Sequence, residues 1–210
     1  MGVPEPLRTA PPARNPGAAV AENLKSLTAG QAQFAALDFM GAVILAGKGE
    51  YRDWRAIAAI HQRTLTSVIT LDGYGITSPK DLEGKEVGAS TGSANQLLFP
   101  AYARLAGIDA SKVKFQNGKT TDLNGWLVTG KVRALTTFLL GQVAIEKAAG
   151  GKKAIVFPFG QYTTPLSGEA FGAIDEQRLA KAIATLQDAG LMPAGRKPAD
   201  LAALALTPKA

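Results

Sequence analysis

The sequence of 210 residues contains no cysteine and a single histidine, His61. Without cysteine the chain can form no disulfide, no thiolate nucleophile and no cysteine-based zinc site. One histidine is too few for the common zinc centres, so we expect no metal site and no cofactor. Long hydrophobic runs are missing as well. No apolar stretch approaches the ~18 residues of a membrane-spanning helix, so we expect no insertion into a membrane.

The charge pattern also lacks any block of like charges. The 23 Lys and Arg residues exceed the 17 Asp and Glu residues by enough to give a net charge of +6, but they are spread along the chain. No run of basic residues alternates with aromatic ones, so the sequence argues against a nucleic-acid partner and favours anionic ligands only weakly. With 46% hydrophobic residues, the chain can bury the core of one large domain or of two small lobes.

The first 17 residues are rich in proline and have no apolar segment followed by a small-residue cleavage site. They therefore do not match an intact secretory signal, and we expect a disordered leader.

Beyond the leader, helical and strand patterns alternate along the chain. This alternation predicts an α/β fold with a mostly parallel sheet. The expected helices cover residues 18–30, 39–49, 78–85, 94–107, 121–130, 141–151 and 174–190. The expected strands cover residues 32–38, 86–90, 112–116, 131–137 and 152–159, and residues 54–71 are expected to form one long strand or two joined strands.

A weak internal repeat occurs at an offset of 100 residues. Residues 26–44 align without gaps on residues 126–144, and both copies follow the order helix, glycine cap, buried strand, polar strand end and helix. The repeat has two interpretations: two ordinary strand-helix units of one sheet, or two similar lobes whose strand ends face each other across a cleft.

The sequence partly matches two enzyme motifs, but neither motif is complete. Gly125, Gly130 and Lys131 have the spacing of a phosphate-binding loop, but Val132 replaces the Ser or Thr that would hold Mg²⁺, and a strand is expected where a helix should follow. Residues 88–92 resemble a nucleophile elbow loosely, and the chain's one histidine precedes them instead of following. We expect no catalytic residues.

Four segments together resemble the solute-binding proteins of ABC importers, in the branch that takes nitrate, sulfonates, taurine and thiamine-precursor pyrimidines. They cover residues 26–50, 56–70, 75–109 and 125–135, and the pattern SPKDLEGKEVGASTGS is characteristic of the type II periplasmic-binding fold. The resemblance implies two lobes, one formed by residues 18–72 with 165–210 and the other by residues 73–164. The first lobe is expected to be abbreviated, because the strand-helix unit with which family members open is not found.

The resemblance further implies the function. The chain would be the solute-binding component of an ABC importer, in the periplasm or at the cell surface, with a small-molecule solute and a permease subunit as partners. Two alternatives stay open: a degenerate family member or fragment that acts as an interaction domain, and an enzyme similar to the thiamine-pyrimidine synthases. The absence of cysteine argues against the enzyme, because those synthases carry a cysteine-rich segment.

Ligands of open α/β sheets bind beyond the carboxyl ends of the strands, against helix N-termini. Three predicted strand ends qualify, and each could equally be an ordinary helix cap or core position. The candidate ligand-binding residues at these ends are Asp38; Ser90, Thr91, Gly92, Ser93 and Asn95; and Thr137, Phe138 and Gln142.

Two further candidates lie on the expected first crossing between the lobes. Arg63 could hold an anion with its planar guanidinium, and His61 lies beside it. An ion pair at the surface for Arg63 and a half-buried strand position for His61 are the ordinary alternatives. Trp54 and Trp126 are expected to be packing residues.

Overall fold

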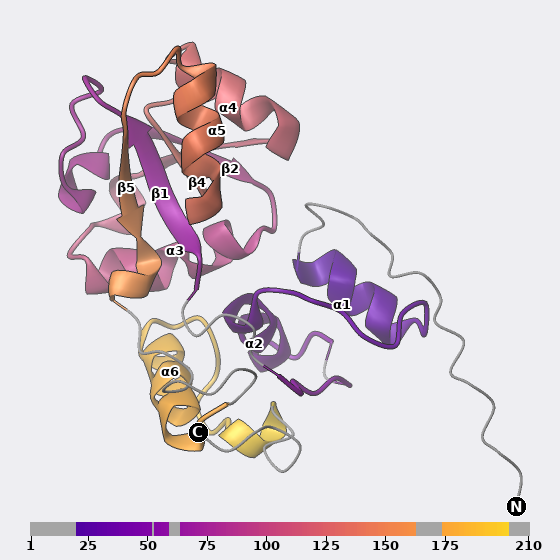
Figure 1. The fold of residues 1–210 in the computed structure, drawn as a ribbon. Coiled ribbons are helices and arrows are strands. Elements are labelled where there is room, and N and C mark those ends of the chain that lie inside the picture. Colours follow the sequence, from indigo (N-terminus) through magenta and orange to yellow (C-terminus); the bar gives the residue numbers. More distant parts are fainter. Residues whose placement is uncertain (1–19, 52, 59–63, 163–173, 202–210) are drawn as a thin grey trace, which may run out of the picture.

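The computed structural model describes residues 20–51, 53–58, 64–162 and 174–201, which form two parts (Figure 1). One part contains a five-stranded sheet and three of the helices. The other contains three helices drawn from both ends of the described chain. The expected leader, residues 1–17, lies outside the described residues.

The sheet has the strand order β3-β2-β4-β1-β5. Its strands are β1 (Thr66–Leu71), β2 (Glu86–Ser90), β3 (Lys114–Gly118), β4 (Ala134–Phe138) and β5 (Ala154–Pro158). Strand β2 pairs in parallel with β3 and β4, whereas β1 is antiparallel to both of its neighbours, β4 and β5. Four strands therefore run in one direction and only β1 runs against them, which confirms an α/β fold with a mostly parallel sheet.

Helices cover both faces of the sheet. Helix α3 (Ala94–Leu105) packs on one face, and helices α4 (Thr120–Val128) and α5 (Gln142–Ala148) pack on the other. Because successive side chains of a strand alternate between faces, Val68 of β1 joins the core under α3 while Ile69 joins the core under α4 and α5.

The second part consists of α1 (Val20–Thr28), α2 (Phe39–Gly47) and α6 (Glu176–Asp188). Its apolar side chains belong to the same core cluster as α3, and α2 contacts α3 directly. Gly41 permits this close approach, since a Cβ at this position would lie 3.1 Å from Val20 Cγ2 and 3.5 Å from Ala94 Cβ. The first turns of α2 and α3 therefore meet.

Local sequence signals set the helix ends close to where they are expected. The carboxylates of Asp38 and Asp175 and the hydroxyl of Ser93 accept hydrogen bonds from the first turns of α2, α6 and α3. Gly190 follows α6 in the left-handed region at φ 69°, where glycine is favoured. The segment expected to form a short helix at 78–85 contains a 3₁₀ turn, Pro79–Leu82.

Two strand predictions are wrong in the second part. Residues 32–38 form no strand, and within the described residues no neighbouring strand pairs with them; Phe34 is 71% exposed. An apolar run becomes a strand only where a partner supplies the ladder of hydrogen bonds. The described residues of the segment 54–71 are not continuous strand either: among them only β1 is regular, and Ala56 donates its N–H to the Leu201 carbonyl at 3.1 Å.

Strand β1 lies on the sheet side of the molecule. We expected residues 18–72 in the lobe formed by the two ends of the chain, but the pairing of β1 with β4 and β5 makes residues 66–71 part of the sheet. The lobe that contains α1, α2 and α6 has no regular strand among its described residues and is abbreviated, as expected.

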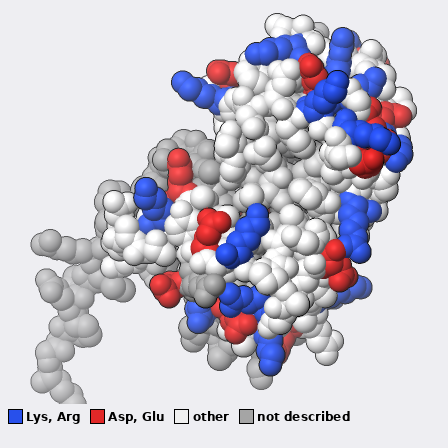
Figure 2. Space-filling model, turned by 180° about the vertical axis from the view of Figure 1, so that it is seen from behind, with Lys and Arg blue, Asp and Glu red and all other residues white. Residues whose placement is uncertain are grey.

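Charged side chains are interspersed on the face shown in Figure 2, where Lys and Arg alternate with Asp and Glu and form no continuous basic track. Within the described residues, no helix has both the length and the apolar character needed to cross a membrane.

Candidate functional site

A cavity of about 1340 Å³ lies between the two parts of the molecule. One side is formed by the first turn of α2 and by residues 32–37 and 53–58, and α6 contributes Lys181, Ala182, Thr185 and Leu186. The other side is formed by α3, by Phe138 at the end of β4, and by Phe159 and Tyr162 after β5. Segments distant in the sequence therefore share one concave surface.

Aromatic side chains form much of the cavity wall. Tyr102 of α3 stacks on Phe159 with ring centroids 4.1 Å apart, and Tyr162 meets the Tyr102 ring edge-on at 5.6 Å. Across the cavity, Phe39 of α2 and Trp54 form an edge-to-face pair at 6.1 Å. The wall can hold the flat or apolar body of a small molecule, and its ring orientations are fixed by mutual packing.

Asp38 is an acidic group on this wall. It is the N-cap of α2: Oδ1 accepts the Gly41 N–H at 2.9 Å, and Oδ2 accepts the Thr64 hydroxyl at 3.1 Å. The Thr64 hydroxyl lies 2.8 Å from that of the buried Thr66, so a short hydrogen-bonded chain fixes the carboxylate. Removal of the carboxylate from solvent raises the pKa of Asp38, and these hydrogen bonds lower it by less.

Buried polar atoms without a partner cluster around the same region. Trp54 Nε1 and the Tyr102 hydroxyl belong to residues that line the cavity, and both residues are at least nine-tenths buried. Asn95 Oδ1, in the first turn of α3, and Thr136 Oγ1, near the end of β4, are also buried and unpaired. Desolvation of the Tyr102 hydroxyl raises its pKa well above the usual range for tyrosine. Unpaired buried polar atoms are rare and costly, and a bound ligand is one means of pairing them.

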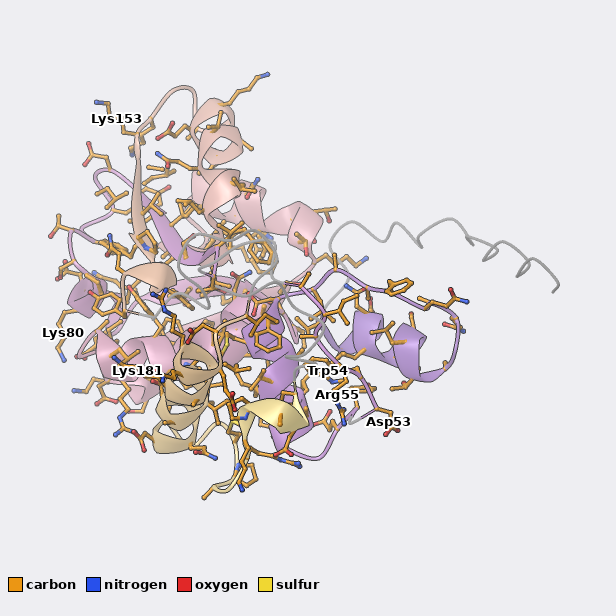
Figure 3. The ribbon with its side chains drawn as sticks, turned by 60° about the horizontal axis from the view of Figure 1, so that its bottom comes forward. Asp53, Trp54, Arg55, Lys80, Lys153 and Lys181 are labelled. Carbon is orange, nitrogen blue, oxygen red and sulfur yellow. The ribbon has the colours of Figure 1, made fainter. Side chains whose placement is uncertain are left out.

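Charged residues lie at the rim of the cavity (Figure 3). Asp53 and Arg55 flank Trp54, and Lys181 projects from α6 on the other side of the view. The Arg55 guanidinium donates to the Trp54 carbonyl at 2.8 Å. All three charged side chains are exposed, in contrast to the half-buried Asp38.

The structure brings two of the predicted site residues together in the cavity: Asp38 and Phe138. They occupy the same position in the two copies of the internal repeat, 100 residues apart. Their common location is what the two-lobe interpretation of the repeat predicts, although only the second copy contains a regular strand.

The predicted residues at the end of β2 do not line this cavity. Gly92, at φ 68°, donates its N–H to Gln96 Oε1 at 3.1 Å, and Ser93 caps α3 through the Gln96 N–H. Thr91 is exposed beside them. These contacts are those of a helix cap, and a ligand-binding role for the segment stays a prediction.

Ser90 ends β2 and stands at the centre of a G-x-S-x-G pattern, residues 88–92. Its Oγ lies 3.3 Å from the Thr120 hydroxyl, at the start of α4. Among the described residues, the Ser90 hydroxyl has the Thr120 hydroxyl as its hydrogen-bond partner. The arrangement is not that of an activated serine nucleophile, which needs an adjacent base.

The remaining predicted residues are dispersed. Thr137 lies opposite Ser67, whose hydroxyl donates to the Thr137 carbonyl at 3.1 Å, and Gln142 donates to Glu146 within α5 at 3.1 Å. Neither lines the cavity. His61 and Arg63 fall outside the described residues.

The sequence did not identify Trp54, Tyr102 or Lys181 as site residues. Trp54 was assigned to packing, and it does pack against Phe39. A signal for Tyr102 was present: with Leu98 and Leu105 it forms an apolar stripe at helical spacing, and these three residues line the cavity together.

Other catalytic or metal sites gain no support from the geometry. Among the described residues, no group of three or more His, Asp or Glu side chains could hold a metal ion. Lys131, from the incomplete phosphate-binding motif, lies over the Trp126 ring at 3.8 Å, and β4 follows it instead of a helix.

The family described as NMT1/THI5 like matches residues 14–185 of the chain. A comparison with curated proteins finds no match. Similar solved structures include a Bordetella bronchiseptica protein, at 22% identity and a TM-score of 0.50, which covers 67% of this chain and 44% of its own. The periplasmic aliphatic sulphonate binding protein SsuA from Escherichia coli has 16% identity and a TM-score of 0.53, and the match covers 81% of this chain and 56% of that chain.

A third similar structure is the ligand-binding component of an ABC-type import system from Staphylococcus aureus with zinc bound. It has 9% identity and a TM-score of 0.65, and covers 90% of this chain and 84% of its own. At these sequence identities, the similarity to the solved structures shows a shared fold alone. The chain spans about half the length of the Bordetella and Escherichia proteins.

Proposed function

Because the chain belongs to the NMT1/THI5-like family, we propose that it is a solute-binding component of an ABC importer that captures a small polar or anionic molecule in the cavity between its two parts. The observation that carries this proposal is the cavity itself, which both parts line and to which the equivalent positions Asp38 and Phe138 contribute. A ligand held by both parts would stabilise their closed arrangement.

Several solute classes fit the family: sulfonates or taurine, nitrate, and pyrimidines related to thiamine precursors. The volume of about 1340 Å³ supports an organic solute, because pockets of roughly 300–1,000 Å³ already accommodate drug-sized molecules. The partner that would take the solute onward is a permease subunit, and a periplasmic or cell-surface location follows from the same proposal. Similar structures include a periplasmic sulphonate-binding protein, which supports this assignment.

We propose binding without catalytic turnover. The similar structures named above as binding proteins or ligand-binding components support this view. The cavity wall is mainly aromatic and aliphatic, and its half-buried acidic group, Asp38, also caps α2.

A second candidate function, an interaction domain, is favoured by one surface feature. Leu140 and Val143 are 75% and 74% exposed next to Phe138, which is 43% exposed. Exposed apolar side chains that are neighbours mark protein-protein contacts more often than isolated ones do.

Filling the cavity should abolish solute binding without unfolding the protein. Ala182 of α6 lines the cavity, whereas Ala184 of the same helix is exposed and does not. We expect Ala182→Trp to weaken the affinity for a bound solute at least tenfold, because the indole occupies space that the solute needs. Ala184→Trp should leave the affinity unchanged, and both variants should lose similar helix stability, about 0.5 kcal/mol.

The measurement is isothermal titration with taurine, an alkanesulfonate, nitrate, bicarbonate and an aminopyrimidine. Equal affinities in the two variants would place the solute outside the cavity. A chain that binds none of these solutes, and whose melting temperature none of them raises, would argue for the interaction domain.

A further inference from the structure

Asp38 brings a carboxyl group to the cavity wall, where its removal from solvent raises its pKa. Its oxygens accept hydrogen bonds from the Gly41 N–H, the Thr64 hydroxyl and the Met40 N–H, although an ionised carboxylate offers about four acceptor sites. Within the described residues, no Lys or Arg side chain forms an ion pair with it. These hydrogen bonds from neutral groups orient the carboxylate but supply no opposite charge.

The orientation of the carboxylate does not depend on a ligand. Thr64 is itself tied to the buried Thr66, and the Gly41 N–H belongs to the first turn of α2. The acceptor sites that remain are therefore fixed in space. A preorganised acceptor of this kind binds a donor without first losing side-chain freedom.

Independent evidence for a ligand comes from two unpaired polar atoms that belong to residues lining the cavity. Trp54 Nε1 can only donate a hydrogen bond, and the Tyr102 hydroxyl can donate or accept. Both residues line the cavity and are at least nine-tenths buried. The lining of the cavity thus combines the Asp38 carboxyl group with two unpaired polar atoms on aromatic side chains.

The charges at the rim have the opposite sign. Arg55 and Lys181 are exposed and line the outer part of the cavity, where an anionic group of a solute could remain partly hydrated. A sulfonate or nitrate placed beside Asp38 would instead meet a like charge with little water to screen it. The inner and outer parts of the cavity therefore favour different groups.

Resting on the proposed solute-binding function, we infer that the solute carries an ammonium or another N–H donor that pairs with Asp38, on an aromatic or apolar body that packs between the Trp54 and Tyr102 rings. This inference favours amine-bearing organic solutes over inorganic anions and simple sulfonates. The same geometry makes Asp38 a specificity-determining residue as well as a helix cap.

Two probes with the same body and opposite charge test the inference: 2-phenylethylamine and 2-phenylethanesulfonate, titrated calorimetrically into the full chain. Asp38→Asn keeps a side chain that caps helices equally well but removes the charge. We expect the amine to bind the unmodified protein more tightly than the sulfonate does. Asp38→Asn should weaken amine binding at least tenfold and leave the sulfonate unchanged or improved.

Asp122→Asn is the matched control, because Asp122 is an exposed acid in the first turn of α4 and does not line the cavity. It should leave the affinity of both probes unchanged. If Asp38→Asn does not fold, Asp38→Ser keeps a capping oxygen and carries the same expectation.

Tighter binding of the sulfonate, or an amine affinity that does not respond to the change at Asp38, overturns the inference. Binding of neither probe also overturns it. In that case the proposed function still stands if taurine, an alkanesulfonate, nitrate, bicarbonate or an aminopyrimidine binds and Ala182→Trp abolishes this binding. If none of these solutes binds in that way, the proposed function is wrong as well.

Discussion

Replacing Phe99 with alanine is expected to lower the free energy of unfolding by about 3–5 kcal/mol. The Phe99 side chain is 1% exposed and lies at the centre of the aromatic cluster beneath the cavity. Its ring centroid is 4.8 Å from that of Phe115, 6.0 Å from Tyr102 and 6.4 Å from Phe159. The deletion leaves a void that these neighbours cannot fill without losing their own packing.

Chemical denaturation measures the effect, and Phe138→Ala is the matched control. Phe138 is 43% exposed, so its replacement should cost less than about 1 kcal/mol. Because Phe138 lines the cavity, the same variant should bind solute more weakly. Equal losses of stability in the two variants would mean that the aromatic cluster around Phe99 does not form as described.

Replacing Gly88 with valine should also be strongly destabilising, by about 3 kcal/mol, because it overpacks the centre of the sheet. A Cβ at Gly88 would lie 2.7 Å from Leu135 Cδ2 and 3.4 Å from both Leu123 Cδ2 and Val132 Cγ2. These three side chains are fully or almost fully buried between the sheet and α4. They have no free space into which to move.

Gly125→Ala is the opposite case. Gly125 lies inside α4, and a Cβ there would meet nothing within 4 Å. This variant should be more stable by about 0.5–1 kcal/mol, because alanine favours the helix. Thermal and urea denaturation of both variants should give shifts of opposite sign. A Gly88→Val protein with unchanged stability would contradict the packing of β2 against β4 and α4.

The sequence predicted well those elements whose ends carry local signals. Helices α2, α3 and α6 begin after Asp38, Ser93 and Asp175, each of which caps its helix with a side-chain oxygen. Four of the five strands of the sheet were also predicted close to their observed bounds, whereas the strand expected over residues 54–71 is regular only as β1 among its described residues. Such signals depend only on neighbouring residues, and a single sequence displays them.

The failed strand prediction at residues 32–38 has a non-local cause. Its apolar pattern suits a buried strand, but in the structure Phe34 is exposed and no neighbouring strand among the described residues pairs with the segment. The similar segment 100 residues later forms β4, since β1 and β2 lie on either side of it. The same local pattern thus gives a strand only where partners exist.

Of the predicted site residues, Asp38 and Phe138 line the cavity, and they stand at equivalent positions of the internal repeat. A ligand-binding role for them stays a prediction. Trp54 and Tyr102 belong to segments far apart in the sequence, and only the packing of the two parts, with α2 against α3, brings both to the same cavity. No spacing in the sequence encodes that contact.

The most direct test of solute binding in the cavity uses the two tryptophans of the chain. Trp54 lines the cavity. Trp126 lies on α4, where its ring packs against the Lys131 ammonium, and it does not line the cavity. Trp126→Phe leaves Trp54 as the only indole fluorophore, and Trp54→Phe leaves Trp126. On titration with 2-phenylethylamine and the sulfonate, nitrate and pyrimidine solutes, we predict a saturable change of emission for at least one solute in the Trp126→Phe protein and none in the Trp54→Phe protein. A change confined to the Trp54→Phe protein, or no change in either, would contradict the assignment of this cavity as the solute-binding site.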